Sequence, residues 1–232
     1  MHNVILGVDL GPRSDWTAIM AVDRYLPEGS EKYHYDLLHL ERGHWELRGV
    51  IERVAAVRAE VEHHYGRDTA WVVLDQTGVG EFVVGPFREA GLNPIPVIIT
   101  GGVKPTYSWR GRPPRRPSHV TAKATVPKRD LVSVLQVLLE MDRLHIAESL
   151  PDLNVLVREL ENFRAKITTA GNDTYEAWRE GDHDDTVLAT ALACWFAERM
   201  LPGIERPGAV VRGYPLDGRS RAATPFSAPA LR

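Results

Sequence analysis

Cysteine is almost absent from this sequence, since Cys194 is the only one among 232 residues. A lone cysteine cannot form an internal disulfide, which argues against a small disulfide-stabilised secreted scaffold and favours a reducing environment. Apolar runs long enough to span a membrane are also missing. The short apolar stretch at the N-terminus is interrupted by Asp9, so it does not read as a signal peptide. These absences predict a cytoplasmic protein with no membrane partner.

The sequence has no excess of charge of one sign. Its 28 Lys and Arg residues oppose 31 Asp and Glu residues, and a formal net charge of −3 neither requires nor excludes a nucleic-acid partner. The distribution is uneven, however, because residues 101–129 contain no acid. This basic stretch holds eight cations, which are Lys104, Arg110, Arg112, Arg115, Arg116, Lys123, Lys128 and Arg129. Its prolines and its lack of periodicity predict an irregular extended loop, and its charge predicts binding to phosphates rather than a merely solvated surface.

Hydrophobic periodicity predicts one α/β domain over residues 1–201 and a flexible Pro/Gly/Arg tail over residues 202–232. The first three strands should form an antiparallel meander, and a helix should then cross the sheet. Strands are expected at 3–10, 16–23, 33–41, 70–74, 94–100 and 144–147, helices at 45–65, 82–90, 131–141, 153–163 and 183–200, and a hairpin at 165–178. The last helix should place Val187, Leu188, Ala191, Leu192 and Trp195 on one face.

The first strand carries an acid to its end. Residues 4–8 are almost uninterruptedly apolar, which is typical of a buried central strand, and Asp9 follows before the turn at Gly11 and Pro12. A buried carboxylate remains ionised only when it is paired, hydrogen-bonded or bound to metal. Asp9 is therefore a candidate ligand, although an aspartate at the end of a strand can also be a simple turn former.

Acids recur at two further turns. Asp75 ends the apolar run 70–74 and precedes a glycine-containing turn, and His183, Asp184 and Asp185 open the last predicted helix. Acids at a helix start can instead cap it and oppose its dipole. Three acidic turns together favour a site for divalent cations, which prefer oxygen ligands.

The order β-β-β-α-β-α-β-α, with acids ending two of the strands, resembles the ribonuclease H-like fold of nucleases and integrases. That resemblance implies a mixed sheet, antiparallel at first and parallel afterwards, flanked by helices. The runs VPKRDLVSVLQVLLEMDRLHI, LVRELENF and HDDTVLATALA narrow the similarity to the nuclease domain of the large terminase subunit of tailed bacteriophages. It extends over about residues 3–200.

The resemblance implies an endonuclease that cuts concatemeric viral DNA during genome packaging with two Mg²⁺ or Mn²⁺ ions. Its motifs place the catalytic and metal-binding acids at Asp9, Asp75, Asp184 and Asp185. Asp9 is the candidate bridging ligand, and we favour Asp185 over Asp184. Residues that could surround or replace these ligands are Asp15, Glu81 and His183. The implied partners are double-stranded DNA, a separate packaging ATPase, the small terminase subunit and the portal, in the host cytoplasm.

The sequence departs from a complete large terminase in one respect. It contains no G-x-x-x-x-G-K-[ST] loop for an ATPase motor, and Met1 stands directly before the first strand. We therefore expect a nuclease domain without its motor. The motor could be encoded separately, the chain could be a segment of a longer protein, or the nuclease could serve another DNA-processing task.

Three other functions stay open at this point. An actin-like ATPase or sugar kinase can also begin with an apolar-Asp-x-Gly strand, but it needs two such domains; stabilisation by ATP would favour it. A non-catalytic DNA-packaging module would show no cleavage with Mn²⁺. A Holliday-junction resolvase would share the acids but cut four-way junctions rather than linear duplex.

Overall fold

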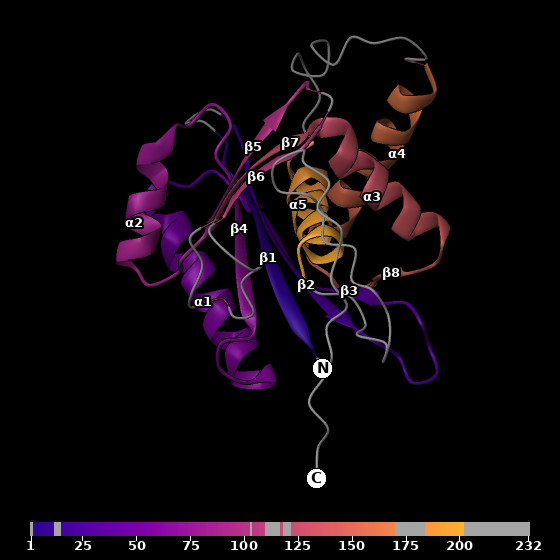
Figure 1. Cartoon of the computed structure of the whole chain (residues 1–232), viewed down its shortest axis with the longest axis horizontal. Helices are drawn as coiled ribbons and strands as arrows, with labels where there is room; N and C mark the ends of the chain where they lie inside the picture. The colour runs from indigo at the N-terminus through magenta and orange to yellow at the C-terminus, as the bar shows by residue number, and fades with distance from the viewer. Residues whose placement is uncertain are drawn as a thin grey trace, which may run out of the picture.

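One eight-stranded sheet runs through the protein and carries helices on both faces (Figure 1). The strand order is β6-β7-β5-β4-β1-β2-β3-β8. This computed structural model describes residues 2–11, 15–102, 104–109, 117, 122–169 and 184–201, with only the backbone described at Trp109 and at 163–169.

The strands are β1 (Asn3–Asp9), β2 (Thr17–Tyr25), β3 (His34–Gly43), β4 (Ala70–Asp75), β5 (Ile95–Thr100), β6 (Thr106–Trp109), β7 (Ala122–Pro127) and β8 (Leu144–Ile146). The helices are α1 (Leu47–Tyr65), the 3-10 turn η1 (Glu81–Val83), α2 (Val84–Glu89), α3 (Lys128–Glu140), α4 (Leu153–Thr169) and α5 (Asp185–Arg199). Strands β1, β2 and β3 form an antiparallel meander, whereas β1, β4, β5 and β7 are parallel to one another. The predicted mixed sheet, an antiparallel meander followed by parallel strands, is confirmed.

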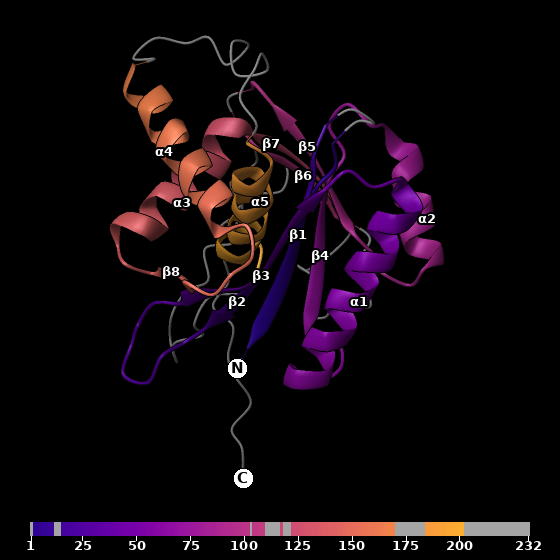
Figure 2. The ribbon, with the colours of Figure 1, turned by 180° about the vertical axis from the view of Figure 1, so that it is seen from behind.

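The two central strands, β1 and β4, are apolar except for Asn3 and their terminal aspartates, because both faces of the sheet are covered. Helices α1 and α2 lie on one face, and α3, α4 and α5 lie on the other (Figures 1 and 2). The side chains divide by strand alternation. The α1 face receives Val4, Leu6, Val8, Val72 and Leu74, and the α5 face receives Ile5, Trp71 and Val73.

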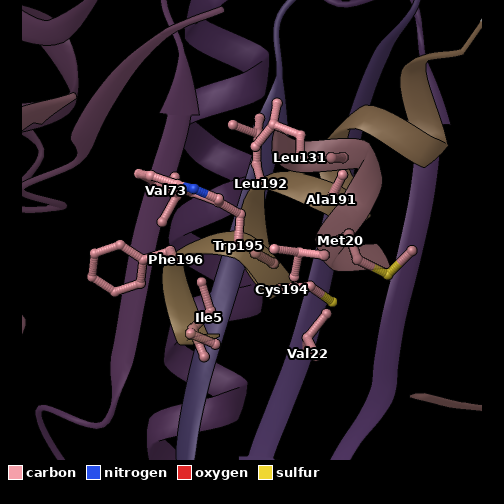
Figure 3. Close-up of a cluster of buried hydrophobic side chains, with 14 of the residues drawn as sticks. Ile5, Met20, Val22, Val73, Leu131, Ala191, Leu192, Cys194, Trp195 and Phe196 are labelled. Carbon is pink, nitrogen blue, oxygen red and sulfur yellow. The ribbon is translucent and has the colours of Figure 1, made fainter. Parts of the chain in front are cut away.

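Helix α5 is the centre of the larger core. Figure 3 shows its Leu192, Trp195 and Phe196 among side chains of β1, β2, β4 and α3. The five residues predicted to share one face are buried, and so is every other residue from Asp185 to Ala197. The helix contacts strands on one side and α3 and α4 on others, and its many alanines permit that close packing.

The basic stretch contains two strands that periodicity did not reveal. Strand β6 pairs antiparallel with β7, and β7 joins the sheet parallel to β5. Tyr107 of β6 stacks on Trp195 of α5, with ring centroids 6.0 Å apart, and Ala122, Ala124 and Val126 of β7 are buried. Small alanines alternating with polar residues gave a weak strand signal. The prediction of an irregular loop is therefore wrong at 106–109 and 122–127.

Two further boundaries differ from the predictions. Lys128 and Arg129 belong to the first turn of α3, and α4 continues to Thr169, so the first residues of the predicted hairpin at 165–178 are helical. Residues 170–183 and the predicted tail at 202–232 lie outside the described residues, so the domain boundary after residue 201 stays a prediction.

The approach of α5 to β1 depends on Gly7. A β-carbon at this position would lie 2.0 Å from the backbone oxygen of Ala189 and 3.2 Å from the β-carbon of Ala193. No side chain fits that space, so glycine is required for α5 to lie directly on the sheet.

We expect Gly7→Ala to lower the free energy of unfolding by about 1–3 kcal/mol or more, because a backbone oxygen must move to admit the methyl group. Chemical denaturation measures the change. Gly85→Ala is the matched control, since a β-carbon there meets nothing within 4 Å and alanine favours a helix by roughly 0.5–1 kcal/mol. A Gly7→Ala protein as stable as the wild type would contradict the close approach.

Candidate active site

Two aspartates stand side by side at the carboxyl ends of neighbouring parallel strands. The β1–β4 register ends with Val8 opposite Leu74, and the next residue of each strand is an aspartate, Asp9 and Asp75. Both are 7% exposed. Alternation places both carboxylates on the α5 face of the sheet. The sheet therefore brings together the first two predicted site residues.

The first turn of α5 adds a third carboxylate. Gly7 lies against Ala189, Asp9 is two residues farther along β1, and Asp185 is one helical turn before Ala189. Because each step spans about 6 Å, both acids reach the same edge of the sheet. Asp185 is also 7% exposed. Its charge, more than that of Asp184, raises the pKa of Asp9.

Burial and mutual repulsion shift the pKa values of these acids. Burial raises the pKa of Asp9 well above its usual value, and the charges of Asp75, Asp185 and Asp184 raise it further. Burial also raises the pKa of Asp75, although hydrogen bonds from Thr77 oppose this shift. A hydrogen bond links the Asp9 and Asp75 carboxyl groups. A protonated Asp9 can donate it to an ionised Asp75, so one proton reduces the repulsion between the pair.

Burial raises the pKa of Asp185 to about 6, with Arg42 acting against the shift and Asp15 adding to it. The predicted neighbour Asp15 therefore lies near the acids. Its Oδ1 accepts a hydrogen bond from the backbone N–H of Trp16, and its carbonyl oxygen is 3.0 Å from Nδ1 of His44. These contacts help to order the chain between β1 and β2.

The turn after β4 is fixed by its own hydrogen bonds. The backbone N–H of Thr77 donates to Asp75 Oδ1 at 2.7 Å, and Thr77 Oγ1 accepts from the N–H of Ile99 at 2.7 Å. The N–H of Gln76 donates to the carbonyl of Val97 at 2.8 Å. Asp75 is therefore held in place by the neighbouring strand as well as its own.

Two cations balance the acids. Lys128 Nζ lies 2.6 Å from Asp184 Oδ2, and Arg42 Nη2 lies 3.1 Å from Asp185 Oδ2. The Arg42 guanidinium also covers the Trp16 ring, with its carbon 4.3 Å from the ring centroid. Asp184 and Asp185 thus have different partners, which distinguishes the two members of the pair.

The sequence patterns did not identify two residues of this region as part of the site. Arg42 follows Leu40 on the core side of β3, and Glu159 of α4 lies within the run LVRELENF. Glu159 Oε2 accepts hydrogen bonds from the backbone N–H and hydroxyl of Thr186 and from the N–H of Val187. A cation at a core-facing strand position was the available signal for Arg42. The Glu159 hydrogen bonds join α4 to α5, which are separate elements of the chain, so no local sequence pattern indicates them.

Other predicted residues are placed differently. Glu81 is exposed and forms an ion pair with Lys123, which lowers the pKa of Glu81. Lys128 lies among the acids, whereas Lys104 is exposed before β6. His183, Arg110, Arg112, Arg115 and Arg116 lie outside the described residues.

The donor set suits a hard cation, because carboxylate oxygens are the ligands that Mg²⁺ and Mn²⁺ prefer. Within the described ranges, no three His, Cys, Asp or Glu side chains are close enough to hold one ion. Arg42 and Lys128 instead balance the charges of Asp185 and Asp184. The same described ranges contain no helix with the length and apolarity to span a membrane.

Without divalent metal, we expect stability to fall as pH rises from about 4 to 6. A carboxyl group whose pKa folding raises binds more protons when folded, so it favours the folded state at low pH and loses that effect between its usual value, 3.8, and the value of about 6 at Asp185. Asp9→Asn should therefore be more stable than wild type at pH 7, with the gain vanishing below pH 3.8.

Urea denaturation in EDTA across this pH range measures the difference, and the exposed Glu28→Gln variant is the control. An Asp9→Asn protein less stable than wild type at pH 7 would contradict the clustering of the acids.

Sequence comparison finds that this chain is similar to terminase large subunits. No family model matches the chain. The terminase large subunit of Thermus virus P23-45 is 27% identical over 194 residues, which cover 83% of this chain. The chain spans only 31% of the length of that relative.

Solved structures include similar chains. The large terminase nuclease of thermophilic phage G20c has a TM-score of 0.49 and 19% identity, covering 85% of this chain and 82% of the other. A Mn-soaked human cytomegalovirus terminase nuclease domain has a TM-score of 0.47 and 13% identity, covering 84% and 83%. The sequence similarity to terminase large subunits confirms the resemblance to the tailed-phage large terminase that the motifs indicated.

Proposed function

We propose that this chain is a divalent-metal-dependent endonuclease of the terminase type, which hydrolyses phosphodiester bonds of double-stranded DNA. One observation carries the proposal: the buried carboxylates of Asp9, Asp75 and Asp185 converge from β1, β4 and α5 at one edge of the sheet. Repulsion among them disfavours the metal-free folded state. That arrangement is useful to a protein that binds cations there.

In this proposal Asp9, Asp75 and Asp185 would hold two Mg²⁺ or Mn²⁺ ions, which would polarise the phosphodiester and promote attack by water. Asp9 holds the central position, and Asp75 and Asp185 flank it. The Thr77 hydrogen bonds keep Asp75 oriented. Asp184 remains the alternative to Asp185, with Lys128 as its partner in the absence of metal. Each residue thus contributes charge and orientation, and the ions supply the Lewis acid.

The DNA path in this proposal follows the basic stretch. Lys128 belongs to the acidic site itself, and Lys123 lies on the neighbouring strand β7. The remaining proposed phosphate contacts are Lys104, Arg110, Arg112, Arg115, Arg116 and Arg129. Phosphate contacts fix position and do not read sequence. We therefore expect this surface to bind the DNA backbone.

The biological setting belongs to the same proposal. The domain covers residues 1–201, a tail follows at 202–232, and the nuclease acts on concatemeric viral DNA in the host cytoplasm. A packaging ATPase, a small terminase subunit and a portal would be its partners. The similarity of the chain to terminase large subunits supports this setting.

Asp9→Asn and Asp75→Asn should each reduce cleavage of linear duplex DNA at least about a hundredfold, since several kcal/mol of transition-state stabilisation depend on the ions. Gel assays with Mn²⁺ or Mg²⁺ measure the rate, and EDTA should stop the reaction. Cutting of a four-way junction but not of duplex would instead identify a resolvase.

The matched control is Asp23→Asn. Asp23 is a buried acid of β2 with a raised pKa, and it pairs with Val4 at the opposite end of β1, roughly 16 Å from Asp9. This variant should cut normally. Wild-type cleavage by a folded Asp9→Asn protein would show that the site is wrong.

Replacing Arg112, Arg115 and Arg116 with alanine should weaken binding to unrelated DNA sequences alike. Each lost phosphate contact should flatten the slope of log affinity against log salt by roughly 0.9. Fluorescence anisotropy at several salt concentrations measures the slope, and the α1 arginines Arg48, Arg53 and Arg58 provide the control triple variant. An unchanged slope would remove these residues from the DNA path.

A further inference from the structure

Glu159 of α4 is a buried acid that the proposed reaction does not use. It is 5% exposed, and its Oε2 accepts three hydrogen bonds from the first turn of α5. The N–H of Thr186 donates at 2.9 Å and the N–H of Val187 at 3.2 Å. These are backbone groups that no carbonyl within the helix can satisfy. Glu159 therefore fixes the helix turn that begins with Asp185.

Arg42 connects Glu159 to Asp185. Its Nη1 lies 3.7 Å from Glu159 Oε1, and its Nη2 lies 3.1 Å from Asp185 Oδ2. The Arg42 side chain is 11% exposed, so both ion pairs are shielded from water. Arg42 Nε and Glu159 Oε1 are buried without a hydrogen-bond partner among the described residues. The guanidinium is therefore shared between two acids largely by charge, and not locked to one of them.

We propose that Glu159 is a positioning residue for Asp185: it holds the first turn of α5 and retains part of the Arg42 charge, which leaves Asp185 available to a divalent cation. This inference rests on the proposed metal site, and it gives a role to the run LVRELENF. If Glu159 were absent, the α5 turn would lose its three acceptor contacts and Arg42 would have Asp185 as its remaining acidic partner in these two ion pairs. Both changes disfavour a cation at Asp185.

Titration calorimetry with MnCl₂ tests the inference without requiring cleavage. Glu159→Ala should weaken Mn²⁺ binding roughly 10- to 100-fold, the range found when a residue that orients a ligand is removed. Glu159→Gln keeps an acceptor oxygen for α5 but loses the charge, so its affinity should lie between those of wild type and Glu159→Ala. Equal losses of Mn²⁺ affinity in the two variants would overturn the claim that Glu159 positions the helix turn.

A second variant separates positioning from general destabilisation. In the Glu159→Ala background, Arg42→Ala should recover part of the Mn²⁺ affinity, because it removes the cation that then competes for Asp185. A purely structural role for Glu159 predicts further loss instead. If Glu159→Ala does not fold, Glu159→Gln decides alone: weaker binding supports the inference, and wild-type affinity overturns it.

The matched control is Glu41→Ala. Glu41 Oε2 lies 2.8 Å from Arg53 Nη1, and Arg53 covers the Trp45 ring at 4.3 Å, so this set repeats the Glu-Arg-Trp arrangement on the α1 face of the sheet, opposite to the acids. Its Mn²⁺ affinity should equal that of wild type. Loss of binding in Asp9→Asn but not in Glu159→Ala would overturn this inference alone. Absence of Mn²⁺ binding by the wild type would overturn the proposed function and the inference with it.

Discussion

The contact between α5 and β1 at Gly7 is the constraint on which the candidate site depends. The backbone of Ala189 occupies the space that a side chain at position 7 would need, so α5 lies directly on the sheet and its first turn reaches the end of β1. Trp195 and Phe196 hold the other end of the helix in the larger core. The same packing that excludes water from the core therefore delivers Asp185 to Asp9 and Asp75.

That geometry has an electrostatic cost. Buried carboxylates repel one another, and the structure limits this repulsion with Arg42 and Lys128 beside the helix start. Hydrophobic packing of α5 offsets the remainder. A site that is stabilised when cations arrive is consistent with the proposed chemistry, and Glu159 and Arg42 would then regulate how readily Asp185 accepts one.

The sequence predicted the elements whose signals are local. The apolar runs ending in Asp9 and Asp75 were visible as buried strands, and their order indicated the mixed sheet. Strands β6 and β7 were not predicted from the sequence, because they are short and partly polar. They are stabilised by pairing with each other and by the stacking of Tyr107 on Trp195. Glu159 and Arg42 were also not identified from the sequence, because their roles depend on tertiary contacts between α4, β3 and α5. Local pattern revealed the acids, and only tertiary structure revealed what surrounds them.

The most direct test of the central claim, that Asp9, Asp75 and Asp185 share divalent cations, is a crystal structure of the protein soaked in Mn²⁺ with anomalous diffraction at the manganese edge. The account predicts anomalous peaks bounded by these three carboxylates, with Arg42 retained by Glu159. Anomalous density elsewhere, or none at millimolar Mn²⁺ with the three acids still ordered, would contradict it.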